Sequence, residues 1–216
     1  MKRHNVLRPN CAKDTKIRVI AYWLISFFSL GVEKNLKTLF IRLIFCTFAR
    51  SKHVYYSERM KLILMTTPDF FVEEHQILTA LFEEGLEILH LRKPHTEPVY
   101  SERLLTLIPE SYRKHIVVHD HFYLKEEYGL MGIHLNKRNP DLPKSYKGHI
   151  SCSCHTVDEA KSCKKFCNYV LYNPLLNESD EGQDITQLKR AVDRLSDTGI
   201  IDKKLVALGG VDAENI

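Results

Sequence analysis

Short apolar runs recur along the chain from residue 60 to its end, with more polar segments between them. Each run has four or five residues and is rich in Ile, Val and Leu, which is typical of strands buried on both faces of a parallel sheet. We predict seven such strands, at residues 61–65, 87–91, 115–118, 131–135, 149–152, 169–172 and 204–208.

Several of the intervening segments carry apolar residues three or four positions apart, as on one face of a helix. They predict helices at residues 73–84, 99–108, 156–166 and 184–195. Gly85 and Gly199 follow the first and the last of these as stop signals, and Thr156 with Glu159 forms a capping box in the third. Alternating strands and helices predict parallel strands joined by right-handed crossovers, in a doubly wound sheet or a (β/α)8 barrel.

The first 59 residues have a different character. They contain an uncharged apolar stretch at residues 19–32 and a second one at 39–48, which Arg42 interrupts. Neither stretch reaches the roughly 20 apolar residues that span a bilayer. A secretory signal fits poorly, because a second basic, aromatic patch follows the first stretch. We interpret residues 1–59 as a leader outside the barrel. Either it precedes the true start at Met60 and is not part of the native protein, or it is a basic membrane-surface anchor.

Composition and charge narrow the class of protein. A chain of 216 residues with 44% hydrophobic residues is globular and has room for one domain with an appendage. The net charge of +4 is uneven, since residues 1–59 hold 12 Lys or Arg against 3 acids and residues 60–216 hold 19 against 24. The predicted barrel is therefore acidic, and we expect no nucleic-acid partner. Membrane contact is expected only if the leader is part of the protein.

Four of the six cysteines lie close together, at Cys152, Cys154, Cys163 and Cys167. Their C-x-C and C-x3-C spacings differ from the C-x2-C pairs of common structural zinc sites. We therefore interpret them as small buried thiols in a reducing cytoplasm, rather than as zinc ligands or disulfides. Cytoplasmic localisation is the corresponding expectation.

Both candidate folds place their chemistry at the carboxyl ends of the strands. Polar residues or glycines stand at five of the seven predicted ends: His90, Arg92 and Lys93; His119, Asp120 and His121; His134 and Asn136; Ser153 and His155; Gly209 and Gly210. Clustered histidines supply acid, base or ligand groups near neutral pH. Basic side chains, and a glycine turn that precedes the first turn of a helix, favour the binding of an anion. The ends therefore predict a site for a small phosphorylated substrate.

These motifs resemble those of the thiamine phosphate synthase/TenI superfamily of (β/α)8 barrels. The similarity covers residues 60–216. It rests on HLR at 90–92, HD at 119–120, GIHLNKRN at 132–139, ISCSCHTVDEA at 150–160, NYVLYNPLL at 168–176 and LVALGGVDAENI at 205–216. The resemblance implies an α/β fold of the TIM-barrel type and a thiamine-biosynthesis enzyme.

Synthase members of this family couple a pyrimidine diphosphate to a thiazole phosphate with Mg²⁺ and expel pyrophosphate. The resemblance implies that Arg92 meets the diphosphate and that Asp120 is a Mg²⁺ ligand. Mg²⁺ and Arg92 would stabilise the charge of the leaving group. The expected substrate-binding residues are Arg92, Lys93, His119, His134, Ser153, Gly209 and Gly210.

The chain departs from the synthase pattern at several positions. Asn139 stands in place of the second Mg²⁺ carboxylate, and Pro94 in place of a lysine for which only Lys93 is a neighbouring substitute. Residues 177–181, in the loop after the sixth predicted strand, contain three acids that would repel pyrophosphate. These changes argue against efficient synthase chemistry.

The TenI branch offers a second reading. Its members are thiazole tautomerases that move a proton within a thiazole carboxylate phosphate, with a His of the Ser-x-His segment as acid and base. His155 stands at that position and is the expected catalytic residue. Synthase and tautomerase both stay open, as does a non-catalytic barrel that binds a phosphorylated small molecule. A homo-oligomer is compatible with the sequence.

The length of the predicted barrel is short for its fold. Residues 60–216 number 157, and the smallest TIM barrels have roughly 200. Seven strands are predicted, and the chain ends just after the seventh. We therefore expect a barrel truncated after its seventh strand, with unpaired edges on the first and seventh predicted strands.

Overall fold

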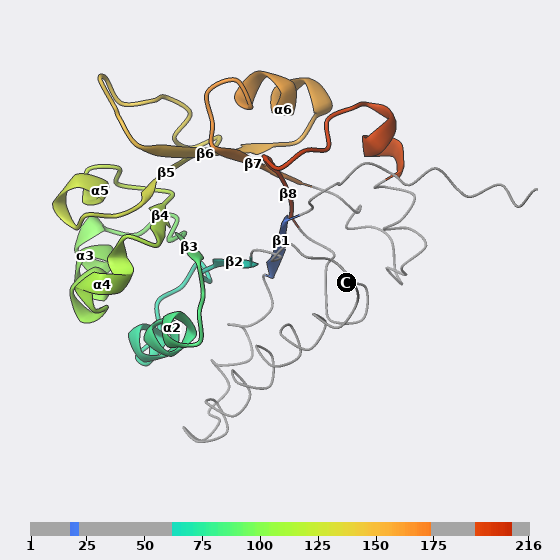
Figure 1. Ribbon diagram of the computed structural model, residues 1–216. Helices are drawn as coiled ribbons and strands as arrows, with labels where there is room; N and C mark the ends of the chain where they lie inside the picture. Colours follow the sequence, from blue (N-terminus) through green and yellow to red (C-terminus); the bar gives the residue numbers. More distant parts are fainter. Residues whose placement is uncertain (1–17, 22–61, 174–192, 209–216) are drawn as a thin grey trace, which may run out of the picture.

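The computed structural model describes residues 18–21, 62–173 and 193–208 (Figure 1). Its strands are parallel and form one closed barrel in the order of the chain. They are β1 (Arg18–Ala21), β2 (Leu62–Met65), β3 (Ile88–Leu91), β4 (Ile116–Val118), β5 (Gly132–Leu135), β6 (His149–Cys154), β7 (Tyr169–Tyr172) and β8 (Leu205–Leu208). The predicted α/β barrel is confirmed, and β2 to β8 correspond to the seven predicted strands.

One strand comes from an unexpected part of the chain. β1 lies in the segment that we interpreted as a leader outside the barrel, at the start of its first apolar stretch. Val19 pairs with Leu62 of β2 on one side and with Ala207 of β8 on the other. The expectation of unpaired edges on β2 and β8 is therefore wrong. The physical reason is that both edges present backbone N–H and C=O groups, and a short extended segment satisfies them together.

Helices cover the outside of the strands (Figure 1). They are α2 (Glu74–Glu83), α3 (Pro98–Leu107), α4 (Glu110–Arg113), α5 (Leu124–Glu127) and α6 (Val157–Cys163). Residues 193–197 are also helical and end the fourth predicted helix, whose first part lies outside the described residues. α4 and α5 are single turns and too short for a periodic pattern to predict. Within the described ranges, no helix is both long and apolar enough to cross a membrane.

The helix signals work as the sequence predicts. Gly85 and Gly199 have φ angles of 101° and 67°, a left-handed conformation that glycine adopts without strain. Thr156 accepts a hydrogen bond from the backbone of Glu159, whose side chain in turn caps the backbone of Thr156. These local interactions fix where the chain turns back toward the next strand.

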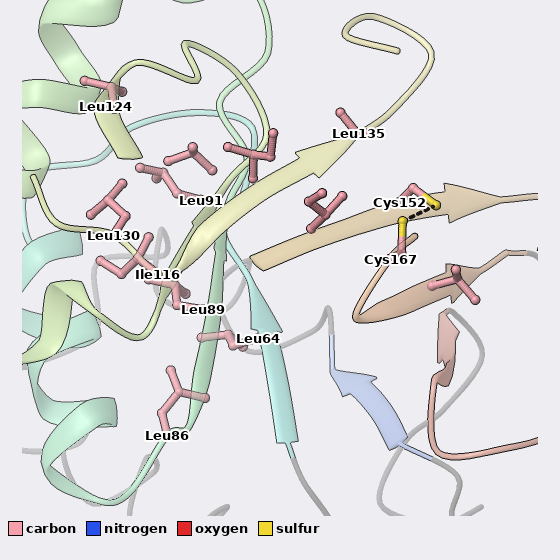
Figure 2. Close-up of a cluster of buried hydrophobic side chains, with 14 of the residues drawn as sticks. Leu64, Leu86, Leu89, Leu91, Ile116, Leu124, Leu130, Leu135, Cys152 and Cys167 are labelled. Carbon is pink, nitrogen blue, oxygen red and sulfur yellow. Dashed lines mark hydrogen bonds between the residues drawn. The ribbon is translucent and has the colours of Figure 1, made fainter. Parts of the chain in front are cut away.

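Alternate residues of the strands face two separate cores. Outward side chains such as Leu64, Leu89 and Leu135 pack in the larger core with residues of the helical layer such as Leu124 (Figure 2). Inward side chains form a smaller apolar cluster that fills the barrel: Ile63, Met65, Ile88, Val117, Tyr169, Leu171 and Val206. Because alternation is strict, a polar residue between two outward apolar ones must lie inside the barrel. This places His90, His134 and Ser151 in the interior.

Candidate active site

Three histidines meet inside the barrel, from β3, from the end of β4 and from β5. Nδ1 of His90 lies 2.8 Å from Nε2 of His119, and the ring of His119 stacks on that of His134 with centroids 4.1 Å apart. All three side chains are buried. Strand-end position brings His119 and His134 together as the sequence predicts.

Hydroxyl groups surround this cluster. Nε2 of His90 lies 2.5 Å from the Tyr169 hydroxyl. The two ring nitrogens of His134 lie 2.9 Å from Oγ of Ser151 and 2.8 Å from Oγ of Ser153. The predicted substrate contact Ser153 is therefore in direct contact with His134. Tyr169 and Ser151 were not predicted as site residues, although both are inward positions of strands next to the site.

The three histidines are neutral at pH 7. Burial, with the nearby His134, lowers the pKa of His90 and His119 well below 6.5. Burial also lowers the pKa of His134 to about 3, with a further contribution from Arg138 and Arg92. Each neutral ring has one N–H donor and one acceptor nitrogen. The cluster is therefore a polar, uncharged floor to the barrel mouth.

This histidine set has the spacing of a metal site, since one nitrogen of each ring lies within 4.8 Å of the others. However, both ring nitrogens of His90 and of His134 already have hydrogen-bond partners. Hydrogen bonding accounts for the arrangement without an ion.

Two arginines give the mouth positive charge. The charges of Arg92 and Arg138 both help to lower the pKa of His119 and His134, which places them near the cluster. The backbone of Arg92 is fixed by Thr66, whose Oγ1 accepts from the Arg92 N–H at 2.9 Å and donates to its carbonyl at 3.1 Å. These bonds fix the backbone of Arg92 just after β3, and its contact with an anion stays a prediction. Arg138 is an additional cation that the strand-end pattern does not reveal.

Lys93, a predicted substrate contact, is held inside the protein. Its Nζ lies 2.6 Å from Oε1 of Glu74 on α2 and donates to the Asp69 carbonyl at 2.8 Å. It also lies 4.4 Å from the centre of the Phe70 ring. Burial lowers the pKa of Lys93 and raises that of Glu74, and their mutual attraction opposes both shifts. The charge of Lys93 is thus balanced within the fold, and its substrate role stays a prediction.

Asp120, the predicted Mg²⁺ ligand, lies beside Asn139 as the resemblance implies. Nδ2 of Asn139 donates to Oδ1 of Asp120 at 3.0 Å. Nη2 of Arg138 lies 3.2 Å from Oδ1 and 3.3 Å from Oδ2 of the same carboxylate. Mg²⁺ sites in proteins use one or two carboxylates with substrate phosphates. Here a guanidinium already contacts both oxygens of the one carboxylate, so this arrangement fits a resident Mg²⁺ poorly.

His155 lies directly after β6, at the carboxyl end where the mouth is. Its Nδ1 lies 2.8 Å from the carbonyl oxygen of Asn173, which can only accept. Nδ1 therefore carries the proton, and Nε2 of the neutral ring is the basic nitrogen. The backbone N–H of His155 donates to Oε2 of Glu159 at 2.7 Å, which fixes the residue at the start of α6. Both hydrogen bonds hold an exposed imidazole in place.

Other predicted residues are not part of this arrangement. His121 has a left-handed backbone with φ of 54°, and its Nε2 lies 3.0 Å from the carbonyl of Thr96 in the preceding loop. Gly209, Gly210 and the acidic loop at 177–181 lie outside the described residues. The phosphate turn at the two glycines stays a prediction.

A parallel α/β barrel with a cationic, hydrogen-bonding carboxyl end has the layout of a barrel enzyme. Residues 62–216 match the family model described as thiamine monophosphate synthase. The chain belongs to the thiamine phosphate synthase/TenI superfamily, as the strand-end motifs indicate.

Solved structures agree with this assignment. A thiamine phosphate pyrophosphorylase from Bacteroides thetaiotaomicron is 57% identical, with a TM-score of 0.61 over 71% of this chain and 74% of that one. A thiamine phosphate pyrophosphorylase from Pyrococcus furiosus is 16% identical, with a TM-score of 0.52 over 70% of this chain and 76% of that one. The second structure supports the fold alone. No curated protein matches the chain.

Proposed function

We propose that the protein acts on a thiazole phosphate in thiamine biosynthesis, as a tautomerase that uses His155 to move a proton. The observation that carries this proposal is the pairing of Asp120 with Arg138, which engages the carboxylate expected to bind the metal. A proton transfer needs a base and an anion anchor, and it needs no metal.

The reaction isomerises the substrate, so its atoms and electrons balance within one molecule. Nε2 of His155 accepts a proton from a ring carbon, and the C–H electron pair becomes part of the ring double bonds. The same nitrogen then returns the proton at the other end of the shifted system. Arg92 binds the phosphate or carboxylate of the substrate, and Ser153 positions the ring over the neutral histidines.

A second candidate is the coupling of a pyrimidine diphosphate to a thiazole phosphate. The name of the 57% identical structure, thiamine phosphate pyrophosphorylase, favours it. Arg92 and Arg138 would then balance the charge of the leaving pyrophosphate. Two features oppose it. Asn139 lacks the carboxylate charge that a Mg²⁺ ion would use, and Glu74 already balances the charge of Lys93, which the diphosphate would use.

Two parallel assays on the full chain separate these reactions. In the first, the thiazole carboxylate phosphate tautomer is added and the aromatic product is followed by proton NMR. In the second, the pyrimidine diphosphate and thiazole phosphate are added with Mg²⁺ and thiamine phosphate is measured. We expect turnover in the first assay. Turnover in the second alone would replace the tautomerase by the synthase, and turnover in neither would leave only a binding role.

A further inference from the structure

Four cysteine sulfurs lie together on the outer side of β6, away from the candidate active site. Sγ of Cys152 lies 3.3 Å from Sγ of Cys167 and 3.9 Å from Sγ of Cys154. Figure 2 shows the first of these contacts among the buried side chains. The sulfurs of Cys152, Cys154 and Cys163 all lie within 4.8 Å of one another.

The fold explains why these spacings work. Cys152 and Cys154 are two residues apart on a strand, so both side chains point to the same face, toward α6. Cys163 ends α6, and the backbone N–H of Cys167 bonds to its carbonyl at 2.9 Å, one turn further on. A C-x-C pair on a strand thus faces a C-x3-C pair at a helix end. The spacing that argued against zinc in the sequence is suited to a site between a strand and a helix.

Burial shields most of the cluster, while one cysteine stays accessible from the surface. Cys152, Cys154 and Cys167 are buried, whereas Cys163 is half-buried and gives access from the surface. Nζ of Lys164, the residue after Cys163, lies 2.8 Å from Oδ1 of Asp202.

A second lysine supports the same end of the cluster. Nζ of Lys204 donates to the carbonyls of Lys164 at 2.8 Å and Cys167 at 2.9 Å, which places a cation against the loop that holds the last cysteine. Asp202 balances the charge of Lys164, so Lys204 is the cation that would offset part of the negative charge of a metal–thiolate centre.

We propose that Cys152, Cys154, Cys163 and Cys167 bind one thiophilic divalent cation, Zn²⁺, in a structural site between β6 and α6. Zinc bound tetrahedrally by four thiolates at about 2.3 Å holds its sulfurs about 3.8 Å apart. The Cys152–Cys167 separation of 3.3 Å and the Cys152–Cys154 separation of 3.9 Å lie around that value, and the sulfurs of Cys152, Cys154 and Cys163 lie within 4.8 Å of one another. Each cysteine releases its proton on binding, so affinity rises with pH. The ion would tie α6 to β6 next to His155 and thereby fix the loop that carries it.

The test uses the full chain, purified with a reductant and loaded with Zn²⁺. We expect one zinc ion per chain after gel filtration. Replacement by Co²⁺ should give an intense near-ultraviolet thiolate-to-cobalt charge-transfer band and the visible bands of tetrahedral cobalt. The absence of a stoichiometric ion and of these bands would overturn the proposal. So would a Cys152–Cys167 disulfide in protein that binds no metal.

Matched variants test the ligand set. Cys154→Ser and Cys163→Ser should each weaken zinc binding by at least about 100-fold, since loss of supporting residues around metal ligands alone costs about 10- to 100-fold. Cys46→Ser removes a thiol outside the described residues and should leave binding unchanged. Binding that survives Cys154→Ser, or that is lost in Cys46→Ser, would overturn the proposal. If Cys154→Ser does not fold, as judged by circular dichroism, the cobalt spectrum of the unaltered chain decides.

Discussion

The inner and outer faces of β6 carry different chemistry, although both belong to the six-residue segment HISCSC. Inside the barrel, Ser151 and Ser153 bond to the neutral ring of His134. Outside it, Cys152 and Cys154 lie against the helical layer. Because successive side chains of a strand point to opposite faces, each face collects one kind of side chain. Ser151 and Ser153 therefore belong to the site inside the barrel, whereas the cysteines between and after them belong to the cluster outside it.

The largest expected effect is on the catalytic rate, from a substitution that alters the candidate active site and leaves the cysteine cluster unchanged. His155→Gln keeps an N–H that can donate to the Asn173 carbonyl but removes the basic nitrogen. We expect the initial rate of tautomerisation to fall by about 100- to 10,000-fold, the usual contribution of general acid–base catalysis. Zinc content should stay the same, because the cysteines face the other way.

The matched control for this variant is His115→Gln, at the opposite end of the barrel, where Nδ1 of His115 lies 3.0 Å from the Glu87 carbonyl. It should keep its full rate. A full rate in His155→Gln would show that another group transfers the proton.

The next expected effect is a loss of stability that disturbs both faces of β6. Gly132 of β5 pairs with His149 of β6, and a Cβ at Gly132 would lie 2.0 Å from the His149 carbonyl oxygen. Gly132→Ala must therefore push β5 and β6 apart. We expect a loss of about 3 kcal/mol in the free energy of unfolding, measured by urea denaturation, as overpacking of a dense core costs. Tautomerase rate and cobalt binding should both fall.

Gly148→Ala is the control for this change. A Cβ there would meet the Tyr146 hydroxyl at 2.8 Å, at the end of a side chain that can move. Its free energy of unfolding should change much less. Equal losses in the two variants would mean that the close contact across β5 and β6 does not set the cost.

Much of the fold follows from pattern, and the exceptions have physical reasons. The apolar runs predict β2 to β8 to within a residue or two. β6 continues past the predicted end to Cys154, because Cys154 pairs with Tyr172 and the inward Ser153 is satisfied by His134. The apolar pattern does not predict β1, because three of its four residues lie at the start of a longer apolar stretch and only the closed sheet selects them.

The candidate site divides in the same way. Strand-end position predicts that Arg92, His119, His134 and Ser153 share a mouth, and it needs no knowledge of loops. Contacts made by loops and neighbouring helices cannot be predicted from strand-end position. Arg138 contacts Asp120 because of the conformation of residues 136–139. Lys93 is buried against Glu74, which belongs to α2. Tyr169 is the first residue of β7, so its strand position does not predict a site residue at the carboxyl end.

A smaller expected effect is on the pH dependence of stability, and it concerns the inner face alone. The pKa of His134 is about 3 in the folded protein and 6.5 in the unfolded chain. Between these two pH values the unfolded chain therefore binds a proton at His134 that the folded protein does not. Its contribution to stability is present above pH 6.5 and falls by about 1.4 kcal/mol per pH unit toward pH 3. His134→Gln should make the unfolding free energy between pH 6.5 and 5 less steep by that amount. An unchanged slope would contradict the neutral interior.

The smallest effect falls at the junction of the two faces. Oγ1 of Thr156 accepts from the Glu159 N–H at 3.2 Å, at the start of the helix that carries Cys163. Thr156→Ala should cost about 1 kcal/mol of stability, as loss of a helix cap does. Oε2 of Glu159 would still hold the His155 N–H, so tautomerase activity should change little. Glu159→Ala removes that contact as well and should lower the rate further. Equal rates in the two variants would show that the position of His155 depends on the zinc-bound helix and not on the capping carboxylate.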